Sequence, residues 1–172
     1  MERFPQPEIT KAGIADFEEL KLLMQTANDY SLEISGIPQW TRWDIAFDRL
    51  AVQLKRDDMF IMRSKDESIT AAICIDDYDE RWGEKANDGQ AVYLHQLMKD
   101  PAKAAPGVGS IFLYFAASEA QRQNKPLLRC DTTTELPRLI KYYEGFGFSK
   151  KGEVVYESSN RPGVLLEAEV TD

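Results

Sequence analysis

The chain has 172 residues, which at the usual size of about 100–200 residues per domain predicts one domain spanning residues 1–172. Its hydrophobic share of 43% and charged share of 29% are ordinary for a globular protein and argue against a disordered or fibrous chain. The formal net charge is -8, from 21 Lys and Arg against 29 Asp and Glu. Most of the surface would therefore repel a polyanion, and no nucleic acid partner is expected.

The composition also bears on compartment, membrane and metal. No apolar stretch approaches the roughly 18–20 residues of a membrane helix, and residues 1–7 lack the apolar core of a signal peptide. Cys74 and Cys130 each lie in a hydrophobic strand-like run, which favours buried thiols in a reducing compartment over a disulfide. One histidine, His95, argues against a dedicated zinc site. We expect a cytoplasmic protein with no metal and no membrane association.

Two amphipathic helices are predicted in the first third of the chain, after a short edge strand over residues 7–12. From Asp16, a suitable N-cap, apolar residues recur at helical spacing until residues 36–38, Gly-Ile-Pro, end the helix. A second helix follows Asp44, again as its cap, with an apolar stripe through Leu50.

Strands alternate with helices in the rest of the chain. Residues 59–63 and 69–75 are rich in β-forming residues on either side of a polar tip, which predicts a hairpin. The acidic, glycine-bearing stretch 76–89 predicts a surface loop. The elements expected after it are a strand over 91–98, a turn over 100–106, a helix to residue 123, a strand over 127–130, a helix from Pro137 to Gly145, and a hairpin of 154–157 with 163–170. This order predicts an α/β protein with a mixed sheet.

A glycine turn joins the strand ending near Met98 to the next helix. Gly107 and Gly109 carry no side chain that would block a ligand, and the helix that follows presents free N–H groups and the positive end of its dipole. Such a turn binds phosphate even on an acidic protein, with Lys99 and Lys103 nearby in the sequence. On spacing alone, a tight turn that binds nothing is an equally good interpretation, because neither a Walker loop nor a dinucleotide fingerprint is present.

Four sequence blocks follow one another in the second half of the chain. They are Tyr93-Leu-His-Gln-Leu-Met with Asp100-Pro101, then Ala105-Pro-Gly-Val-Gly-Ser110, then Leu128-Arg-Cys-Asp131, and last Tyr142-Tyr-Glu-Gly-Phe-Gly-Phe148. Together, in this order and spacing, they resemble the GNAT superfamily of N-acetyltransferases. The first half, with its two helices and Gly36-Ile-Pro-Gln-Trp40, resembles the variable acceptor side of the same superfamily.

The resemblance implies a GNAT-like fold, with a twisted, mostly antiparallel sheet of about seven strands and about four helices. It also implies an enzyme that transfers the acetyl group of acetyl-CoA to a primary amine of a small molecule, by direct attack in a ternary complex. The alternative is a non-catalytic acyl-CoA-binding module or sensor, because two polar positions of the superfamily are Ala104 and Leu136 here. The resemblance leaves open whether the protein is a monomer or a homodimer.

The resemblance further implies roles for individual residues. The pantetheine arm of the cofactor would pair with Leu97, Met98 and Lys99, where a backbone N–H would face the thioester oxygen. Tyr143 would protonate the departing CoA thiolate, and Tyr142 would pack in the core or contact the cofactor. The residues expected to bind the cofactor are Leu97, Met98, Lys99, Ala104, Ala105, Pro106, Gly107, Val108, Gly109, Ser110, Leu136 and Tyr142.

Candidate residues on the acceptor side are basic, acidic or aromatic. His95 is either the catalytic base or a hydrogen-bonded structural histidine. Asp131 is either a base that holds a water or a strand-end turn residue. The acidic residues of the loop 76–80 are a solvated surface, or they attract a cationic acceptor such as a polyamine, an amino acid or an aminoglycoside. Large aromatic residues in loops or at helix ends line a pocket or cap the core: Tyr30, Trp40, Trp43 and Trp82.

Overall fold

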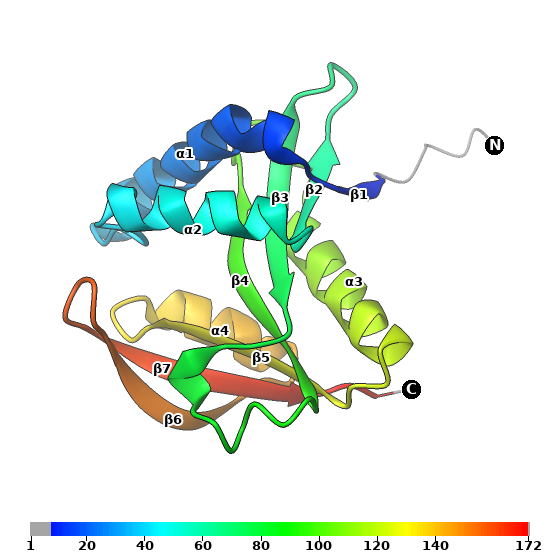
Figure 1. The fold of residues 1–172 in the computed structure, drawn as a ribbon. Coiled ribbons are helices and arrows are strands. Elements are labelled where there is room, and N and C mark those ends of the chain that lie inside the picture. Colours follow the sequence, from blue (N-terminus) through cyan, green and yellow to red (C-terminus); the bar gives the residue numbers. More distant parts are fainter. Residues whose placement is uncertain (1–7, 172) are drawn as a thin grey trace.

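The computed structural model describes residues 8–171, which contain one twisted seven-stranded sheet with helices packed on both faces (Figure 1). The strand order is β1-β2-β3-β4-β5-β7-β6, and every neighbouring pair is antiparallel except β4 with β5. The predicted mixed, mostly antiparallel sheet is therefore confirmed. The strands are β1 (Ile9–Lys11), β2 (Met59–Arg63), β3 (Ile69–Asp76), β4 (Ala91–Lys99), β5 (Leu127–Thr133), β6 (Ser149–Tyr156) and β7 (Arg161–Glu169).

Two hydrophobic cores lie on the two faces of the sheet. One is built with α1 and α2, which run side by side in Figure 1, and the other with α3 and α4. Strand β3 contributes to both, because Ile73 belongs to the α3/α4 core and Cys74 to the α1/α2 core. Among residues 8–171, no helix has the length and apolarity needed to cross a bilayer. The helices are η1 (Ile14–Asp16), α1 (Phe17–Ser35), α2 (Trp43–Lys55), η2 (Glu80–Trp82), α3 (Val108–Arg122) and α4 (Pro137–Gly145).

Local sequence signals explain where several elements begin and end. Gly36 ends α1 in the left-handed conformation, with φ +72°, and its amide donates to the carbonyl of Leu32 at 2.8 Å. Pro137 occupies the first turn of α4, where its missing N–H leaves no carbonyl without a partner. Cys74 and Cys130 are both buried free thiols, as predicted. The predicted edge strand falls at β1, while its first residue, Pro7, lies outside the described residues.

Three boundaries differ from the prediction. Helix α2 begins at Trp43 after Arg42, so Asp44 lies in the first turn and pairs with the Arg42 guanidinium at 2.8 Å instead of capping the helix. Strand β5 continues past Cys130, as far as Thr133. Strand β6 begins at Ser149 and not at residue 154, because it is a half-exposed edge strand whose polar first residues give no alternating pattern.

The stretch 76–89 is also more structured than the predicted loop. Asp76 still belongs to β3, and η2 follows within the loop. The loop covers the face of β5 that α1 and α2 leave free. Its Ala86 carbonyl accepts a hydrogen bond from the Arg129 guanidinium at 2.6 Å, and the Trp82 ring lies 4.7 Å from that guanidinium.

The parallel pair β4–β5 separates part of the way along its length. The ladder runs from Ala91 opposite Leu127 to Leu94 opposite Cys130, although both strands continue beyond it. Figure 1 shows β4 turning away with β3 while β5 runs on beside β7. The β5-facing edge of β4 after Leu94 therefore has no partner strand within the described residues.

A β-bulge lies in β4 at the same level. His95 lies opposite Cys74 and Met98 lies opposite Ala72, so Gln96 and Leu97 share the position across from one β3 residue. Gln96 accordingly has a positive φ of +51°. The bulge turns the end of β4 and redirects its side chains at the point where the sheet divides.

We expect the α1/α2 core to depend on Leu50, which is fully buried at the sheet-facing side of α2. Leu50→Ala should lower the free energy of unfolding by about 2–5 kcal/mol, because it removes packed atoms and leaves a cavity. Val52→Ala in the same helix, at a side chain 45% exposed, should change it by less than about 1 kcal/mol. Urea denaturation of the two variants measures both free energies of unfolding. Equal losses of stability in the two variants would contradict the packing described for Leu50.

Candidate active site

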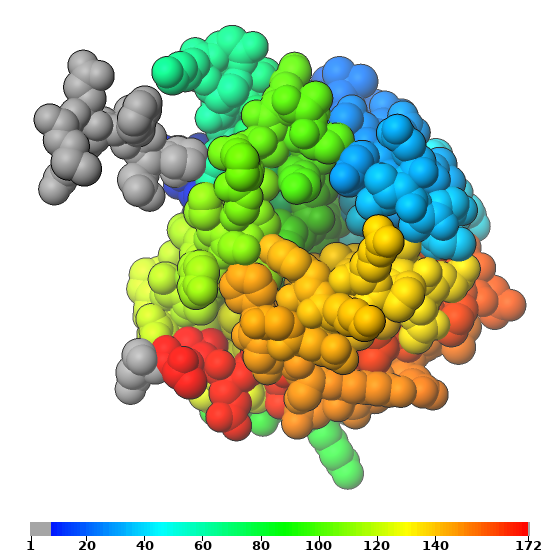
Figure 2. All heavy atoms as spheres, turned by 180° about the vertical axis from the view of Figure 1, so that it is seen from behind, coloured from blue at the N-terminus to red at the C-terminus, as the bar shows by residue number. Residues whose placement is uncertain are grey.

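Two cavities meet where β4 and β5 separate. The larger, here called the groove, has a volume of about 740 Å³. Figure 2 shows it as a hollow between α1 (blue), the start of α3 (green) and α4 (yellow to orange). The smaller, here called the inner cavity, has a volume of about 180 Å³ and is lined by α2, η2, β4, β5 and the β6–β7 turn. The residues that line both are Gln39, Leu97, Leu136, Leu139 and Tyr143.

The glycine turn lies at the groove. Gly107 precedes α3 with φ +77°, a backbone conformation that residues other than glycine rarely adopt. Within the described residues, the amides of Gly107, Gly109 and Ser110 donate to no backbone or side-chain acceptor, and all three residues line the groove together with Lys99. These orphan donors at a helix N-terminus are suited to bind an anion.

Gly109 has a second role, which is to make room for Tyr142. A Cβ atom on Gly109 would lie 2.6 Å from the Tyr142 hydroxyl oxygen, so the phenol lies directly against the first turn of α3. Tyr142 also packs against Tyr143 and Phe146, with ring centroids 5.7 and 5.6 Å away. Because residue 109 has no side chain, the Tyr142 ring can lie against α3 and form part of the wall of the groove.

Not every residue predicted to bind a cofactor lines the groove. Leu97, Met98, Lys99, Val108 and the glycine turn do. The structure does not bring Ala104, Ala105 or Pro106 to it. Ala104 instead packs against the α3/α4 core, and its amide donates to the Asp100 carbonyl at 2.9 Å. Leu136, 8% exposed, lies at the junction of the two cavities.

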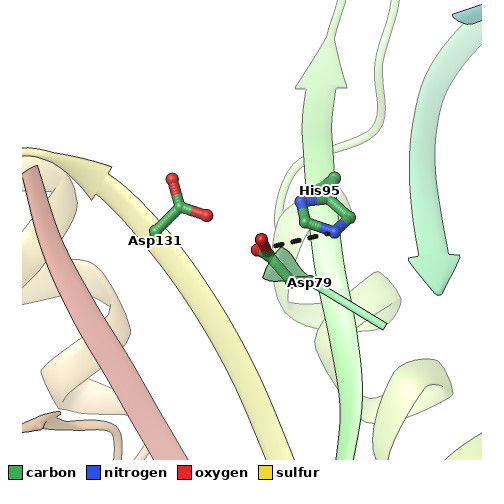
Figure 3. A group of neighbouring side chains, drawn as sticks. All are labelled: Asp79, His95 and Asp131. Carbon is green, nitrogen blue, oxygen red and sulfur yellow. Dashed lines mark ion pairs between the residues drawn. The ribbon is translucent and has the colours of Figure 1, made fainter. Parts of the chain in front are cut away.

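His95 lines the inner cavity and faces Asp79 (Figure 3). Asp79 is the N-cap of η2, where one carboxylate oxygen accepts from the Arg81 amide at 2.9 Å. Its other oxygen, Oδ2, lies 3.9 Å from His95 Nε2. Burial lowers the pKa of His95 below its ordinary value, against the opposing effect of the Asp79 charge, so the imidazole is neutral at pH 7.

Asp131 lies on the other side of the same cluster. Its Oδ2 accepts a hydrogen bond from the Tyr156 hydroxyl at 2.6 Å, and its Oδ1 lies 3.5 Å from the Arg81 guanidinium. Burial, and next the Asp131 charge, raise the pKa of Tyr156, so its hydroxyl keeps its proton and remains a donor. The prediction left Asp131 either in a turn or at the site, and the structure brings it to the inner cavity.

Asp79, His95 and Asp131 are residue types that bind metals, and one ligand atom from each lies within 4.8 Å of the others. The Arg81 guanidinium, however, is 3.6 Å from Asp79 and 3.5 Å from Asp131. It already supplies the positive charge that a metal ion would bring, and it would repel such an ion. The cluster therefore fits an ion-pair network better than a metal centre.

Tyr143 lies at the junction of the groove and the inner cavity. Its side chain is on α4 and only 7% exposed, with the Phe148 ring edge-on at 5.4 Å. Burial raises the pKa of Tyr143 well above its ordinary value. The phenol therefore stays protonated and can donate a proton or a hydrogen bond to a group held between the two cavities.

The four aromatic residues predicted on the acceptor side have separate positions. Trp40 lines the inner cavity, and its amide donates to the Asn28 side chain at 2.9 Å. Tyr30 lines the groove. The structure brings neither Trp43 nor Trp82 to a cavity, because Trp43 packs on Phe47 with centroids 5.3 Å apart and Trp82 packs beneath Arg129.

Several inner-cavity residues were missed from the sequence. All of them are polar residues that line this cavity, and they are Arg42, Arg49, Arg81, Gln96, Tyr156 and Arg161. A signal was present in α2, where Ile45 and Arg49 are four residues apart and so lie on one helical face. From the sequence, only the apolar stripe of this helix is predicted, and Arg49 is assigned no role.

The chain has the fold of the GNAT acetyltransferases. It is similar to a GNAT-family acetyltransferase from Listeria monocytogenes, with a TM-score of 0.73 and 20% identity over 95% of this chain and 94% of that one. It is also similar to the ribosomal-protein-S18-alanine N-acetyltransferase of Escherichia coli, with a TM-score of 0.68 and 13% identity over 97% and 96%. N-acetylglutamate synthase of Neisseria gonorrhoeae, solved with coenzyme A and N-acetyl-glutamate, matches with a TM-score of 0.70 and 15% identity over 99% of this chain and 36% of that one. No family model and no curated protein matches the sequence.

We expect the contact between Gly109 and Tyr142 to be testable by a double-mutant cycle. Gly109→Ala should lower the free energy of unfolding by about 1–2 kcal/mol, because the new methyl group displaces the phenol. With Tyr142→Phe the nearest ring carbon would be 3.4 Å from that methyl group, so the same change should then cost nothing. Urea denaturation of the four proteins gives the coupling energy, and an equal cost in both backgrounds would contradict the contact.

Proposed function

We propose that the protein is an acetyl-CoA-dependent N-acetyltransferase of the GNAT superfamily that acts on a primary amine of a small molecule. The observation that carries this proposal is the meeting of the two cavities at Tyr143, with orphan amides in the groove and a neutral imidazole in the inner cavity. The likeness of fold to acetyltransferases supports the same function. The acceptors named for these proteins differ, so the acceptor must be inferred from the chain itself.

The groove suits a long anionic thioester such as acetyl-CoA. The amides of Gly107, Gly109 and Ser110 would hold its diphosphate, and Lys99 adds a positive charge. The unpaired edge of β4 at Leu97 and Met98 offers backbone donors and acceptors to an extended arm. Since Ala104 packs on the core, phosphate binding would depend on backbone amides and not on a side chain at that position.

When bound, acetyl-CoA supplies an activated acyl group, and the amine acceptor must be neutral to react with it. His95 would take the proton from the acceptor, because its neutral imidazole lies in the inner cavity beside Asp79. A backbone N–H of the β4 bulge, at Gln96 or Leu97, would stabilise the negative charge that develops on the acyl oxygen. Tyr143 would return a proton to the departing sulfur, since its buried phenol is protonated.

The size of the inner cavity supports a small acceptor. Its volume of about 180 Å³ lies below the roughly 300–1,000 Å³ typical of sites for drug-sized ligands. A second function, a non-catalytic acyl-CoA-binding module, is favoured by the apolar side chains of Ala104 and Leu136 at positions that are polar in the superfamily. Binding of acetyl-CoA without release of thiol in the presence of any amine would support that alternative.

Tyr143→Phe tests the proposed function most directly. The variant should bind acetyl-CoA as the parent does, measured by calorimetry, but lower kcat by about 10²-fold, because the general acid is lost. The rate is measured as free thiol released from acetyl-CoA over a panel of amines. Tyr114→Phe, at a side chain 68% exposed on α3, is the matched control and should leave the rate unchanged. A Tyr143→Phe enzyme as fast as the parent would rule out the acid role.

The pH dependence tests His95. The base works only when unprotonated, so kcat/KM should fall as the pH drops through the pKa of His95, which lies below its ordinary value of 6.5. Since the Asp79 charge raises the pKa of His95, Asp79→Asn should move this acidic limb to still lower pH. His95→Gln should abolish the limb and slow the reaction at pH 7. An unchanged limb in His95→Gln, with the same acceptor, would assign it to another group.

A further inference from the structure

Arginine residues gather around the inner cavity although the chain is acidic. Four of the ten arginines of the chain line it, namely Arg42, Arg49, Arg81 and Arg161. The carboxylate that lines it with them is Asp131. Arginines therefore outnumber carboxylates in the lining of this cavity, although the whole chain has a net charge of -8.

Three of these arginines already have carboxylate partners. Arg42 pairs with Asp44 at 2.8 Å, and Arg161 pairs with Glu135 at 2.9 Å. Arg81 lies between Asp79 and Asp131, at 3.6 and 3.5 Å. Their charges are therefore largely neutralised within the protein.

Arg49 differs from them. Among the described residues, no carboxylate lies within 4.0 Å of its guanidinium and no hydrogen bond from it is made. Its position on the cavity-facing side of α2, one turn after Ile45, directs the side chain to the cavity that it lines. By its surface area Arg49 is exposed, so water reaches its side chain. Desolvation, followed by the Arg81 charge, lowers the pKa of Arg49, and an anion bound beside it would act in the opposite direction.

We propose that the acceptor of the acetyl group carries a carboxylate, which Arg49 binds in the inner cavity while the amine of the same molecule faces His95. This proposal rests on the acetyltransferase function proposed above. A guanidinium presents paired N–H donors that match the two oxygens of a carboxylate, so it recognises this group by shape as well as by charge. The acceptor class is therefore an amino acid or a similarly small amino-carboxylate.

The acidic loop does not support a polycationic acceptor. Asp76, Asp77 and Glu80 do not line the inner cavity, and Asp79 is buried against Arg81 and His95. Asp77 instead pairs with Lys125. A polyamine would have to place further ammonium groups beside Arg49 and Arg81, where like charges repel.

The experiment compares matched acceptors. Thiol release from acetyl-CoA, with the acetylated product identified by mass spectrometry, is measured for amino acids, their amides and the corresponding decarboxylated amines. Phosphoethanolamine and a short peptide with a blocked carboxyl end complete the panel. The carboxylates should exceed their amides in kcat/KM by at least about tenfold, since a charged hydrogen-bonded pair is lost in the amide.

Two variants assign this preference to Arg49. Arg49→Gln should reduce kcat/KM for the preferred carboxylate by about 10–100-fold, mainly through KM, and leave its amide nearly unaffected. Arg49→Lys should recover part of the loss. Arg122→Gln, at an exposed arginine of α3 that pairs with Glu119 at 2.8 Å, is the control and should behave as the parent.

Other outcomes overturn the proposal. The proposal is wrong if the enzyme prefers amides, polyamines, phosphoethanolamine or the blocked peptide over amino acids. It is also wrong if Arg49→Gln lowers kcat/KM equally for a carboxylate and for its amide. If no acceptor releases thiol, the proposed acetyltransferase function fails, and calorimetry of amino acids against the protein with coenzyme A decides. If the parent binds an amino acid and Arg49→Gln does not, the result supports the carboxylate site without the acetyltransferase function. If the parent binds no amino acid, the carboxylate site is refuted.

Discussion

The hydrogen-bond ladder between β4 and β5 stops after four residue pairs, and the two cavities exist because it stops there. Beyond Leu94, β4 stays paired to β3 and β5 stays paired to β7, so the sheet divides into two parts. Backbone donors and acceptors on the inner edge of β4 are then left to a ligand. The bulge at Gln96 and Leu97 lies at this division and directs His95 and Leu97 to the inner cavity.

Electrostatics distinguish the two cavities that this division creates. The groove presents backbone dipoles at the start of α3, which are suited to hold an anion, and Lys99 lines it with them. The inner cavity instead is lined by charged side chains, and Arg81 lies between the carboxylate of Asp131, which also lines it, and that of Asp79. Arg49 lines the same cavity but is exposed and has no carboxylate partner among the described residues, so its guanidinium is available to an anionic ligand.

The strongest local signals of the sequence predicted most of the fold. Gly36 and Pro137 mark a helix end and a helix start through their own backbone chemistry, and tertiary packing has little influence on either. Strand β6 was placed too short because Lys150 and Lys151 give it no apolar alternation, and its pairing with β7 is a long-range contact. Trp82 could not be placed, since its partner Arg129 is 47 residues further along the chain. The site was predictable where it consists of backbone, at the glycine turn, and not where side chains converge from α2, η2 and β7.

An arginine-lined cavity also affects the proton that an amine must lose before it reacts. Burial lowers the pKa of His95, and the Arg81 charge acts in the same direction, so the imidazole is driven toward its neutral form. Asp79 opposes this by raising the pKa of His95, which keeps the imidazole basic enough to accept a proton. In the proposed reaction, Arg49 would bind the carboxylate of the acceptor, and the His95 imidazole, beside Asp79, would receive the proton that the acceptor amine loses.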